Sequence, residues 1–256
     1  MNRVWLNGTL MAGDAAHIGH DDRGLTLGDG VFETIKAMAG RPDHVGLHLA
    51  RLAAGAATLG FAPPYDAATL TDALMRVADG KSCALRLTLT RGPMPRGVLP
   101  TGAAHPTTLI TAGKLPDRFL PARLVVARVT RRNEHSPLSR IKSLNYLDSI
   151  LARQEAEAAG FDDAIMLNTR GDVAEATAAN VFLLIDGKLV TPPVADGALP
   201  GIARSLVLAS GAASEATITA SDLARTGSGF LTNSLGMRQI ARIGDQDLGL
   251  GALPPI

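Results

Sequence analysis

Lys142 is the first residue whose surroundings suggest chemistry. It lies in the segment Ser139-Arg140-Ile141-Lys142-Ser143-Leu144, between a predicted strand and the start of a predicted long helix. A lysine amine that is desolvated at such a junction gives up its proton more readily and can form a Schiff base with a carbonyl compound. The alternative is a surface lysine whose apolar stem covers its neighbours while the amine stays in water, and the spacing alone favours this simpler interpretation.

Glu175 is the second candidate. It stands in Glu175-Ala176-Thr177-Ala178-Ala179-Asn180, among small and apolar residues just ahead of a predicted strand. A carboxylate in such surroundings can keep a heterocyclic nitrogen protonated, which turns a pyridine ring into an electron sink. A strand-edge glutamate paired with an arginine explains the same sequence equally well.

A third segment, Leu199-Pro200-Gly201-Ile202-Ala203, begins a predicted helix directly after a turn that contains proline. The free backbone N–H groups and the dipole of a helix start form a phosphate site. Any helix that starts with Pro-Gly has this property, so the signal is weak by itself. Arg51 is a second possible phosphate partner, because a guanidinium binds phosphate with two parallel hydrogen bonds. Taken alone, Arg51 is more simply a helix-surface arginine.

Hydrophobic periodicity predicts the helices and strands that must position these residues. The Asn7-Gly8 pair predicts a tight hairpin after the first strand. Strands and helices are mixed without the strict alternation of a doubly wound sheet, so we predict an α+β fold with two lobes. The predicted strands are 3–6, 30–37, 84–90, 107–111, 124–129, 163–168, 181–185 and 188–191, and the predicted helices are 46–60, 69–78, 145–159 and 201–209.

A break in composition around residues 113–121 divides the chain. This stretch carries Pro116 and Pro121 and follows a strand-like run. Proline disfavours a continuous helix or a central strand. We therefore expect an N-terminal lobe over 1–115, a linker over 116–121, and a C-terminal lobe over 122–256 that carries the lysine.

Composition excludes several classes of protein. Apolar residues make up 46% of the 256 residues and the formal net charge is +1, so a large core is expected and a nucleic-acid partner is not. The adjacent Arg131 and Arg132 suggest a local anion contact or a solvated surface. No apolar run is long enough to span a membrane. The single Cys83 excludes an internal disulfide, so we expect a cytoplasmic protein.

Histidine spacing does not predict a metal site. His17 and His20 are close in sequence, and His44 and His48 lie one helical turn apart, but no cysteine or well-placed carboxylate completes either set. The usual nucleotide-binding and hydrolase motifs are also missing from the sequence. We therefore expect no metal.

In combination, these segments resemble the class IV aminotransferases, the fold-type IV enzymes that use pyridoxal phosphate (PLP). The resemblance runs along nearly the whole chain, and the segments follow the family's order. The matching segments are 22–34, His48-Leu49-Ala50-Arg51-Leu52, Ile141-Lys142-Ser143-Leu144-Asn145-Tyr146-Leu147, 175–182 and 199–204.

The resemblance implies roles for matching positions. Lys142 would be the Schiff-base lysine and proton carrier, and Glu175 would pair with the pyridine nitrogen. Many relatives have Thr or Ser where Ala203 stands, so a side-chain phosphate contact is expected to be lost, with Asn233 compensating. The implied catalytic residues are Lys142, Thr34 and Tyr146, and the implied cofactor-binding residues are Lys142, Arg51, Glu175, Asn180, Leu199, Gly201, Ile202, Ala203 and Asn233.

Within the family we favour 4-amino-4-deoxychorismate lyase, which eliminates pyruvate and leaves 4-aminobenzoate. Phe32 stands where D-amino-acid transaminases usually carry tyrosine, and lyases often have threonine at the position of Thr34. Arg91 and Arg96 lie in a loop that resembles the lyase's Arg-Gly…Arg-Gly segment and could receive a substrate carboxylate. A solvated basic turn explains those two arginines equally well.

The alternatives are a transaminase acting on D-amino acids, branched-chain L-amino acids or (R)-amines, and a non-catalytic PLP-binding relative. The core motifs do not separate the reactions, because all of them begin with imine exchange on the lysine. The resemblance also implies a homodimer with each site at a subunit interface, and a small amino compound as substrate.

Overall fold

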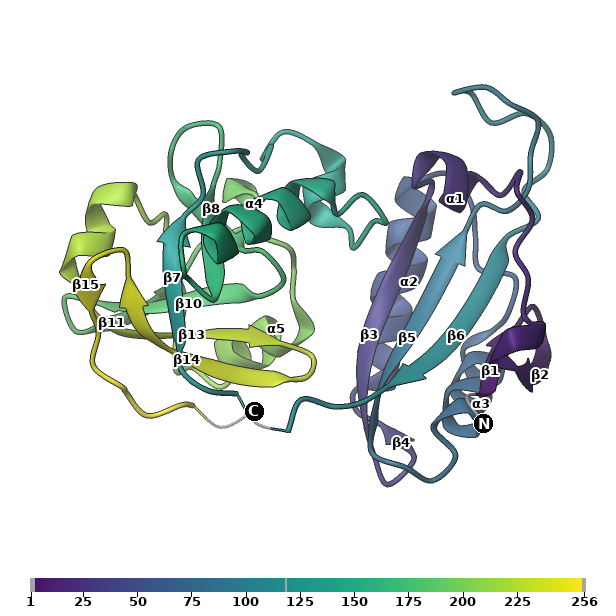
Figure 1. Cartoon of the computed structure of the whole chain (residues 1–256), viewed down its shortest axis with the longest axis horizontal. Helices are drawn as coiled ribbons and strands as arrows, with labels where there is room; N and C mark the ends of the chain where they lie inside the picture. Colours follow the sequence, from purple (N-terminus) through teal and green to yellow (C-terminus); the bar gives the residue numbers. More distant parts are fainter. Residues whose placement is uncertain (1–2, 118, 255–256) are drawn as a thin grey trace. The chain divides into compact units, whose positions relative to one another are not determined.

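The chain divides into two compact units in the computed structural model, which describes residues 3–117 and 119–254 (Figure 1). The first unit holds the described residues up to Pro116 together with Ile141–Asn145. The second holds the described parts of Asp117–Arg140 and of the stretch that begins at Tyr146. None of the helices formed by these residues has the length and hydropathy needed to span a bilayer.

The first unit is built on a six-stranded sheet with the strand order β2-β1-β6-β5-β3-β4. The neighbouring strands are antiparallel. The elements are β1 (Arg3–Leu6), β2 (Thr9–Ala12), the 3-10 helix η1 (Gly13–Ala15), α1 (Arg23–Leu27), β3 (Gly30–Met38), β4 (Arg41–Pro42), α2 (Val45–Thr58), α3 (Ala67–Ala78), β5 (Cys83–Thr90) and β6 (Thr107–Gly113).

Alternation along β5 separates the two faces of this sheet. Leu85, Leu87 and Leu89 are fully buried and share one core with apolar residues of α2 and α3. Arg86, between them, is exposed. Successive side chains of a strand point to opposite faces. The helices therefore cover the face that carries these leucines, and Phe32, Thr34 and Arg86 lie on the other face.

The lysine segment belongs to the first unit, which corrects the expectation that the C-terminal lobe carries Lys142. The Phe32 N–H donates to the Lys142 carbonyl at 2.9 Å, and the Leu144 N–H donates to the Gly30 carbonyl at 2.9 Å. Ile141 joins the core of this unit. Chain order suggested the other lobe, but these long-range hydrogen bonds attach the segment to β3.

The second unit contains a nine-stranded sheet whose main path is β12-β11-β10-β13-β14-β7-β8-β9, with β15 paired to β14. The strands β14, β7 and β8 are parallel neighbours, and the remaining pairs are antiparallel except β11 with β12. The strands are β7 (Ala122–Val126), β8 (Asp163–Leu167), β9 (Val173–Ala176), β10 (Asn180–Ile185), β11 (Lys188–Thr191), β12 (Ser214–Glu215), β13 (Thr226–Asn233), β14 (Gly236–Ile243) and β15 (Gln246–Asp247). The helices are α4 (Leu147–Ala158) and α5 (Ile202–Ala209), with 3-10 helices η2 (Pro137–Arg140), η3 (Val194–Asp196) and η4 (Ala220–Arg225).

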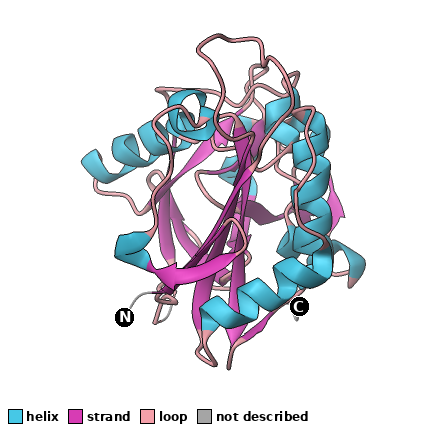
Figure 2. Ribbon diagram, turned by 90° about the vertical axis from the view of Figure 1, so that its right-hand side faces the viewer, coloured by secondary structure: helices cyan, strands magenta, loops and turns pink. Residues whose placement is uncertain are grey.

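The predicted α+β class is confirmed: the chain forms both helices and strands (Figure 2), and their order along the chain shows no regular alternation. The Asn7-Gly8 hairpin is also confirmed, with Leu6 opposite Thr9 and φ angles of 46° and 94° at the two turn residues. Three expectations were wrong in detail. The predicted strand 124–129 ends at Val126, a 3-10 helix rather than a strand precedes Lys142, and Glu175 lies inside β9 rather than ahead of a strand.

Candidate active site

Lys142 lies against an aromatic ring of the first unit. Its Nζ is 4.4 Å from the centroid of the Phe32 ring, and the residue is half-buried. The ring face attracts an ammonium group and keeps water from that side. The structure thus brings together Lys142 and Phe32, which the sequence assigned to catalysis and to the substrate.

Arg86 shares this face of the sheet, although the sequence analysis did not single it out. Its guanidinium carbon is 3.8 Å from the centroid of the Phe32 ring, and it stands opposite Thr34 in the β3–β5 pairing. Residues that oppose each other across two strands share a face. A charged residue between the regularly spaced leucines of this strand was the signal that could have identified it.

Arg51 is engaged by a buried carboxylate. Its Nε donates to Glu33 Oε1 at 2.8 Å and its Nη2 to Glu33 Oε2 at 2.6 Å. His48 Nδ1 lies 2.6 Å from the same Oε2. Burial by itself would raise the pKa of Glu33, but hydrogen bonds from Arg51 and His48 outweigh it and hold the pKa below its usual range. The sequence predicted Arg51 and missed both of its partners.

Arg91 forms an ion pair inside the first unit. Its Nε donates to Asp29 Oδ2 at 2.7 Å, and Nη2 donates to the Leu59 carbonyl. Arg23 Nε donates to the same Asp29 oxygen at 2.8 Å. Burial raises the pKa of Asp29, yet the bonds from Arg91 and Arg23 lower it overall. A substrate carboxylate would have to compete with Asp29 for Arg91, so the substrate role of Arg91 stays a prediction.

Arg96 lines a pocket of about 860 Å³ in the first unit. Arg23 binds the loop that carries Arg96, because it donates to the carbonyls of Gly97 at 2.7 Å and Val98 at 2.8 Å. Arg96 is exposed. Its substrate role also stays a prediction. The pocket is lined by His20, Asp21, Arg23, Thr26, Leu27, Pro93, Met94, Pro95, Arg96, Gly97 and Val98.

Glu175 lies in the second unit with both carboxylate oxygens occupied. Its Oε1 is 3.0 Å from Arg132 Nε, and its Oε2 accepts the Leu199 N–H at 3.0 Å. The side chain is 11% exposed, so it is a largely desolvated anion with a cationic partner. Arg132 is thus the anion contact that the Arg131-Arg132 pair suggested.

Leu199 is held at both of its backbone polar groups. Glu175 accepts its N–H, and Asn180 Nδ2 donates to its carbonyl at 2.9 Å. A Cβ on Gly201 would stand 1.9 Å from Asn180 Oδ1, so a larger residue would have to displace the Asn180 side chain from Leu199. Asn180, expected to bind the cofactor, acts in this structure on the turn that leads into α5.

The start of α5 lacks a side-chain cap. Gly201 is its N-cap residue, and no side-chain hydrogen bond is made there; α2 and α4 also start without one, whereas Asp22 caps α1 and Asp66 caps α3. Ile202 and Ala203 are buried, with exposures of 7% and 6%. Uncapped N–H groups at a buried helix start favour an anion.

Two further predicted residues have local roles. Asn233 Nδ2 donates to the Ala178 carbonyl at 3.3 Å, and its Oδ1 accepts the Leu235 N–H at 2.9 Å. Tyr146 is the N-cap residue of α4 and is half-buried. The phosphate role expected of Asn233 and the catalytic role expected of Tyr146 stay predictions.

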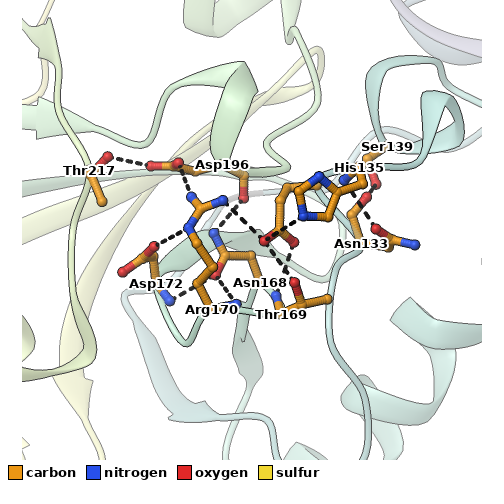
Figure 3. A network of polar contacts seen from close by, with 10 residues as sticks. Asn133, His135, Ser139, Asn168, Thr169, Arg170, Asp172, Asp196 and Thr217 are labelled. Atoms are coloured by element: carbon orange, nitrogen blue, oxygen red, sulfur yellow. Dashed lines mark hydrogen bonds and ion pairs between the residues drawn. The ribbon is translucent and has the colours of Figure 1, made fainter.

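A polar network joins the loop that follows Arg132 to the turn between β8 and β9 and to η3 (Figure 3). Glu134 is 2% exposed and accepts from Thr169 N at 3.0 Å, Thr169 Oγ1 at 2.8 Å and Arg170 Nη1 at 3.1 Å. Arg170 also bonds Asp196 of η3, and Asp196 accepts from Thr217 at 2.7 Å. Burial raises the pKa of Glu134, but these hydrogen bonds and Arg170 lower it to about 2.

Each unit, taken by itself, carries groups of the kind that PLP requires. The first unit offers an amine beside a ring and an oriented guanidinium. The second offers a desolvated carboxylate and the uncapped start of α5. These are the groups needed for an aldehyde, a phosphate and a pyridine nitrogen.

Comparisons with known proteins agree with this assignment. The model of the family described as "Amino-transferase class IV" matches residues 30–243. A putative branched-chain-amino-acid aminotransferase of Methanocaldococcus jannaschii is 34% identical over 211 residues, covering 80% of this chain and 73% of the relative. An aminodeoxychorismate lyase of Vibrio harveyi is 30% identical over 209 residues, covering 80% of this chain and 75% of the relative.

Solved structures of similar fold also include aminodeoxychorismate lyases and aminotransferases. A putative 4-amino-4-deoxychorismate lyase from Legionella pneumophila superposes with a TM-score of 0.86 at 30% identity, covering 94% of this chain and 92% of the other. A branched-chain amino acid aminotransferase from T.th., complexed with N-(5'-phosphopyridoxyl)-L-glutamate, superposes with a TM-score of 0.87 at 25% identity, covering 99% and 89%. The chain therefore belongs to the class IV aminotransferases, a family of PLP-dependent enzymes with the fold-type IV architecture.

Proposed function

We propose that this chain binds PLP through Lys142 and cleaves 4-amino-4-deoxychorismate to 4-aminobenzoate and pyruvate. The observation that carries the proposal is the Lys142 amine 4.4 Å from the hydroxyl-free ring of Phe32, on a sheet face that also carries Arg86. This substrate bears two carboxylates, and the exposed Arg86 and Arg96 are cations suited to receive them. Similarity to aminodeoxychorismate lyases supports the choice.

Lys142 would move protons in this reaction. It would remove the proton from the carbon that bears the amino group and return a proton to enolpyruvate as the carbon–oxygen bond breaks. Thr34 lies two residues from Phe32 on the same strand, and therefore on the same face, where a hydroxyl can relay protons. When bound, PLP supplies an electron sink for the carbon that loses its proton.

The remaining residues would hold the cofactor. Glu175 would keep the pyridine nitrogen protonated, while Leu199 would pack on the ring. The phosphate would be held by Arg51 together with the N–H groups of Ile202 and Ala203. Support comes from the desolvation of Glu175 and from the uncapped start of α5.

A transaminase is the second candidate, favoured by the 34% identity to a putative branched-chain-amino-acid aminotransferase. Lys142 would again remove the proton from the carbon that bears the amino group, and a 2-oxo acid would be required as amino acceptor. Arg86 would receive the second carboxylate of a dicarboxylic 2-oxo acid. The two candidates therefore differ in their products.

The test incubates PLP-loaded protein with aminodeoxychorismate, and separately with D-alanine or L-leucine plus 2-oxoglutarate. We expect 4-aminobenzoate and pyruvate without any acceptor, and neither product from the Lys142→Ala variant. Formation of glutamate without 4-aminobenzoate would contradict the lyase activity and identify the protein as a transaminase. A protein that takes up PLP but forms no product from these substrates, nor from an (R)-amine with pyruvate as acceptor, would be the non-catalytic relative.

We also propose a homodimer in the cytoplasm. Leu147, Ile150 and Leu151 of α4 are 73%, 49% and 45% exposed and lie at helical spacings of three and four, so they form one apolar stripe. Contiguous exposed apolar surface is typical of an interface between proteins. The lone buried Cys83 is consistent with a reducing compartment.

A further inference from the structure

A buried carboxylate and a buried histidine hold the arginine that the proposed function assigns to the phosphate. Glu33 is 0% exposed in β3, and His48 is 2% exposed in α2. His48 and Arg51 are three residues apart on that helix, so both side chains reach the same neighbour. The three side chains form one cluster inside the first unit.

Glu33 sets the plane of the Arg51 guanidinium. The bonds from Nε at 2.8 Å and from Nη2 at 2.6 Å use one edge of the group in a fork geometry. Because the guanidinium is planar and rigid, occupation of one edge also determines where its other donors point. The Arg51 side chain keeps 12% of its surface exposed, so the cluster does not bury it completely.

His48 in turn fixes Glu33. An ionised carboxylate only accepts hydrogen bonds, so His48 Nδ1 must carry the hydrogen in its 2.6 Å contact with Oε2. Rotation of the carboxylate would break this bond and both bonds to Arg51. Glu33 is therefore held from two directions.

We propose that Glu33 and His48 are positioning residues that preorganise Arg51 for the phosphate of PLP. The inference rests on the proposed function, in which Arg51 contacts that phosphate. A long arginine side chain that is already ordered loses less conformational freedom when it binds an anion. The cluster would therefore strengthen binding of the phosphate without touching it.

The experiment compares the dissociation constants of PLP and of pyridoxal, which lacks the phosphate, by equilibrium dialysis. In Glu33→Gln, the amide NH₂ meets donors of Arg51 or His48, and at least one hydrogen bond of the cluster is lost. We expect the PLP dissociation constant to rise about tenfold or more, the size of effect seen when residues that orient metal ligands are replaced. The pyridoxal constant should stay unchanged.

Asp29→Asn is the matched control, since Asp29 is another carboxylate of the first unit that is held by two arginines. Replacing the Asp29 carboxylate should change the dissociation constants of PLP and of pyridoxal by the same factor. His48 provides a second pair of variants that leaves Glu33 in place. His48→Asn keeps an N–H donor near the position of Nδ1 and should retain the preference for PLP, whereas His48→Leu removes the donor and should weaken it.

The outcomes separate this inference from the proposed function. Equal affinity of the wild type for PLP and pyridoxal, or an unchanged preference in Arg51→Met, would contradict the phosphate role of Arg51 itself. If Arg51→Met loses the preference but Glu33→Gln behaves like Asp29→Asn, the positioning role is overturned. Should Glu33→Gln fail to fold by circular dichroism, the two His48 variants decide the question in the same way.

Discussion

At the residue scale, Glu175 combines two interpretations that the sequence left open. It is paired with an arginine, Arg132, as a structural glutamate would be, and it is also largely desolvated, as a partner for a pyridine nitrogen should be. The two are compatible, because the guanidinium stabilises the ionised carboxylate. Leu199 N–H binds the other oxygen and so links the carboxylate to the start of α5.

Arg132→Met should therefore leave Glu175 as a largely buried carboxylate without its cation. We expect a loss of about 3 kcal/mol in the free energy of unfolding, at the low end for a broken buried pair because Arg132 keeps 17% exposure. Arg131→Met is the control, since Arg131 Nη1 donates to backbone carbonyls, those of Ala127, Arg128 and Thr130. Urea denaturation measures the free energy of unfolding of both variants. Equal losses in the two variants would mean that the ion pair between Arg132 and Glu175 does not stabilise the fold.

Glu134 predicts how stability responds to acid. Its pKa is about 2 in the folded protein, below the ordinary value of 4.5, so the ionised carboxylate stabilises the folded state above pH 4.5. This stabilisation is lost as the pH falls toward 2. Glu134→Gln should be less stable than the wild type at neutral pH, and the difference should shrink over that range. Thermal unfolding across pH measures it, with the exposed Glu157→Gln as control. A difference independent of pH would contradict the prediction.

At the scale of elements, the short helix α1 is attached to the sheet by its own cap. Asp22 is 1% exposed and accepts from Gly24 N at 2.7 Å, Thr90 Oγ1 at 3.0 Å and Thr107 Oγ1 at 2.6 Å. One carboxylate thus starts α1 and joins it to β5 and β6. Arg23, the next residue, holds the loop that carries Arg96.

Asp22→Ala should detach this helix from the sheet. Two buried threonine hydroxyls and one N–H would lose their acceptor, which costs about 3 kcal/mol or more in the free energy of unfolding. The neighbouring Asp21→Ala, at an exposed position, should change stability little. Chemical denaturation of both variants is the measurement, and similar stabilities would show that Asp22 is dispensable.

At the scale of the whole molecule, the apolar stripe on α4 predicts assembly. Ile150→Glu places a charge in the middle of this stripe and should convert the dimer to a monomer in size-exclusion chromatography with light scattering. Met75→Glu is the control, because Met75 is 47% exposed on α3, outside the stripe. A monomeric wild type, or a dimeric Ile150→Glu variant, would contradict the role of this surface.

Much of the architecture followed from local patterns. Helices at Val45–Thr58 and Ala67–Ala78 and the strand at Cys83–Thr90 lie within two residues of the predicted ranges, because each carries a clear apolar period. The hairpin pair β13 and β14 was missed. Its strands contain glycine, polar and charged residues, and they are stabilised by pairing with β10 and β7 rather than by a local period.

The sequence by itself determined the family and the α+β class and singled out Lys142 as the candidate lysine, because these depend on residue types in a particular order along one chain. Only the tertiary structure decided the partners of those residues. Glu33 reaches Arg51 across 18 positions, Arg132 reaches Glu175 across a larger separation, and Lys142 is attached to β3. Hydrogen bonds of this kind act over about 3 Å in space regardless of distance in sequence, so no local pattern predicts them.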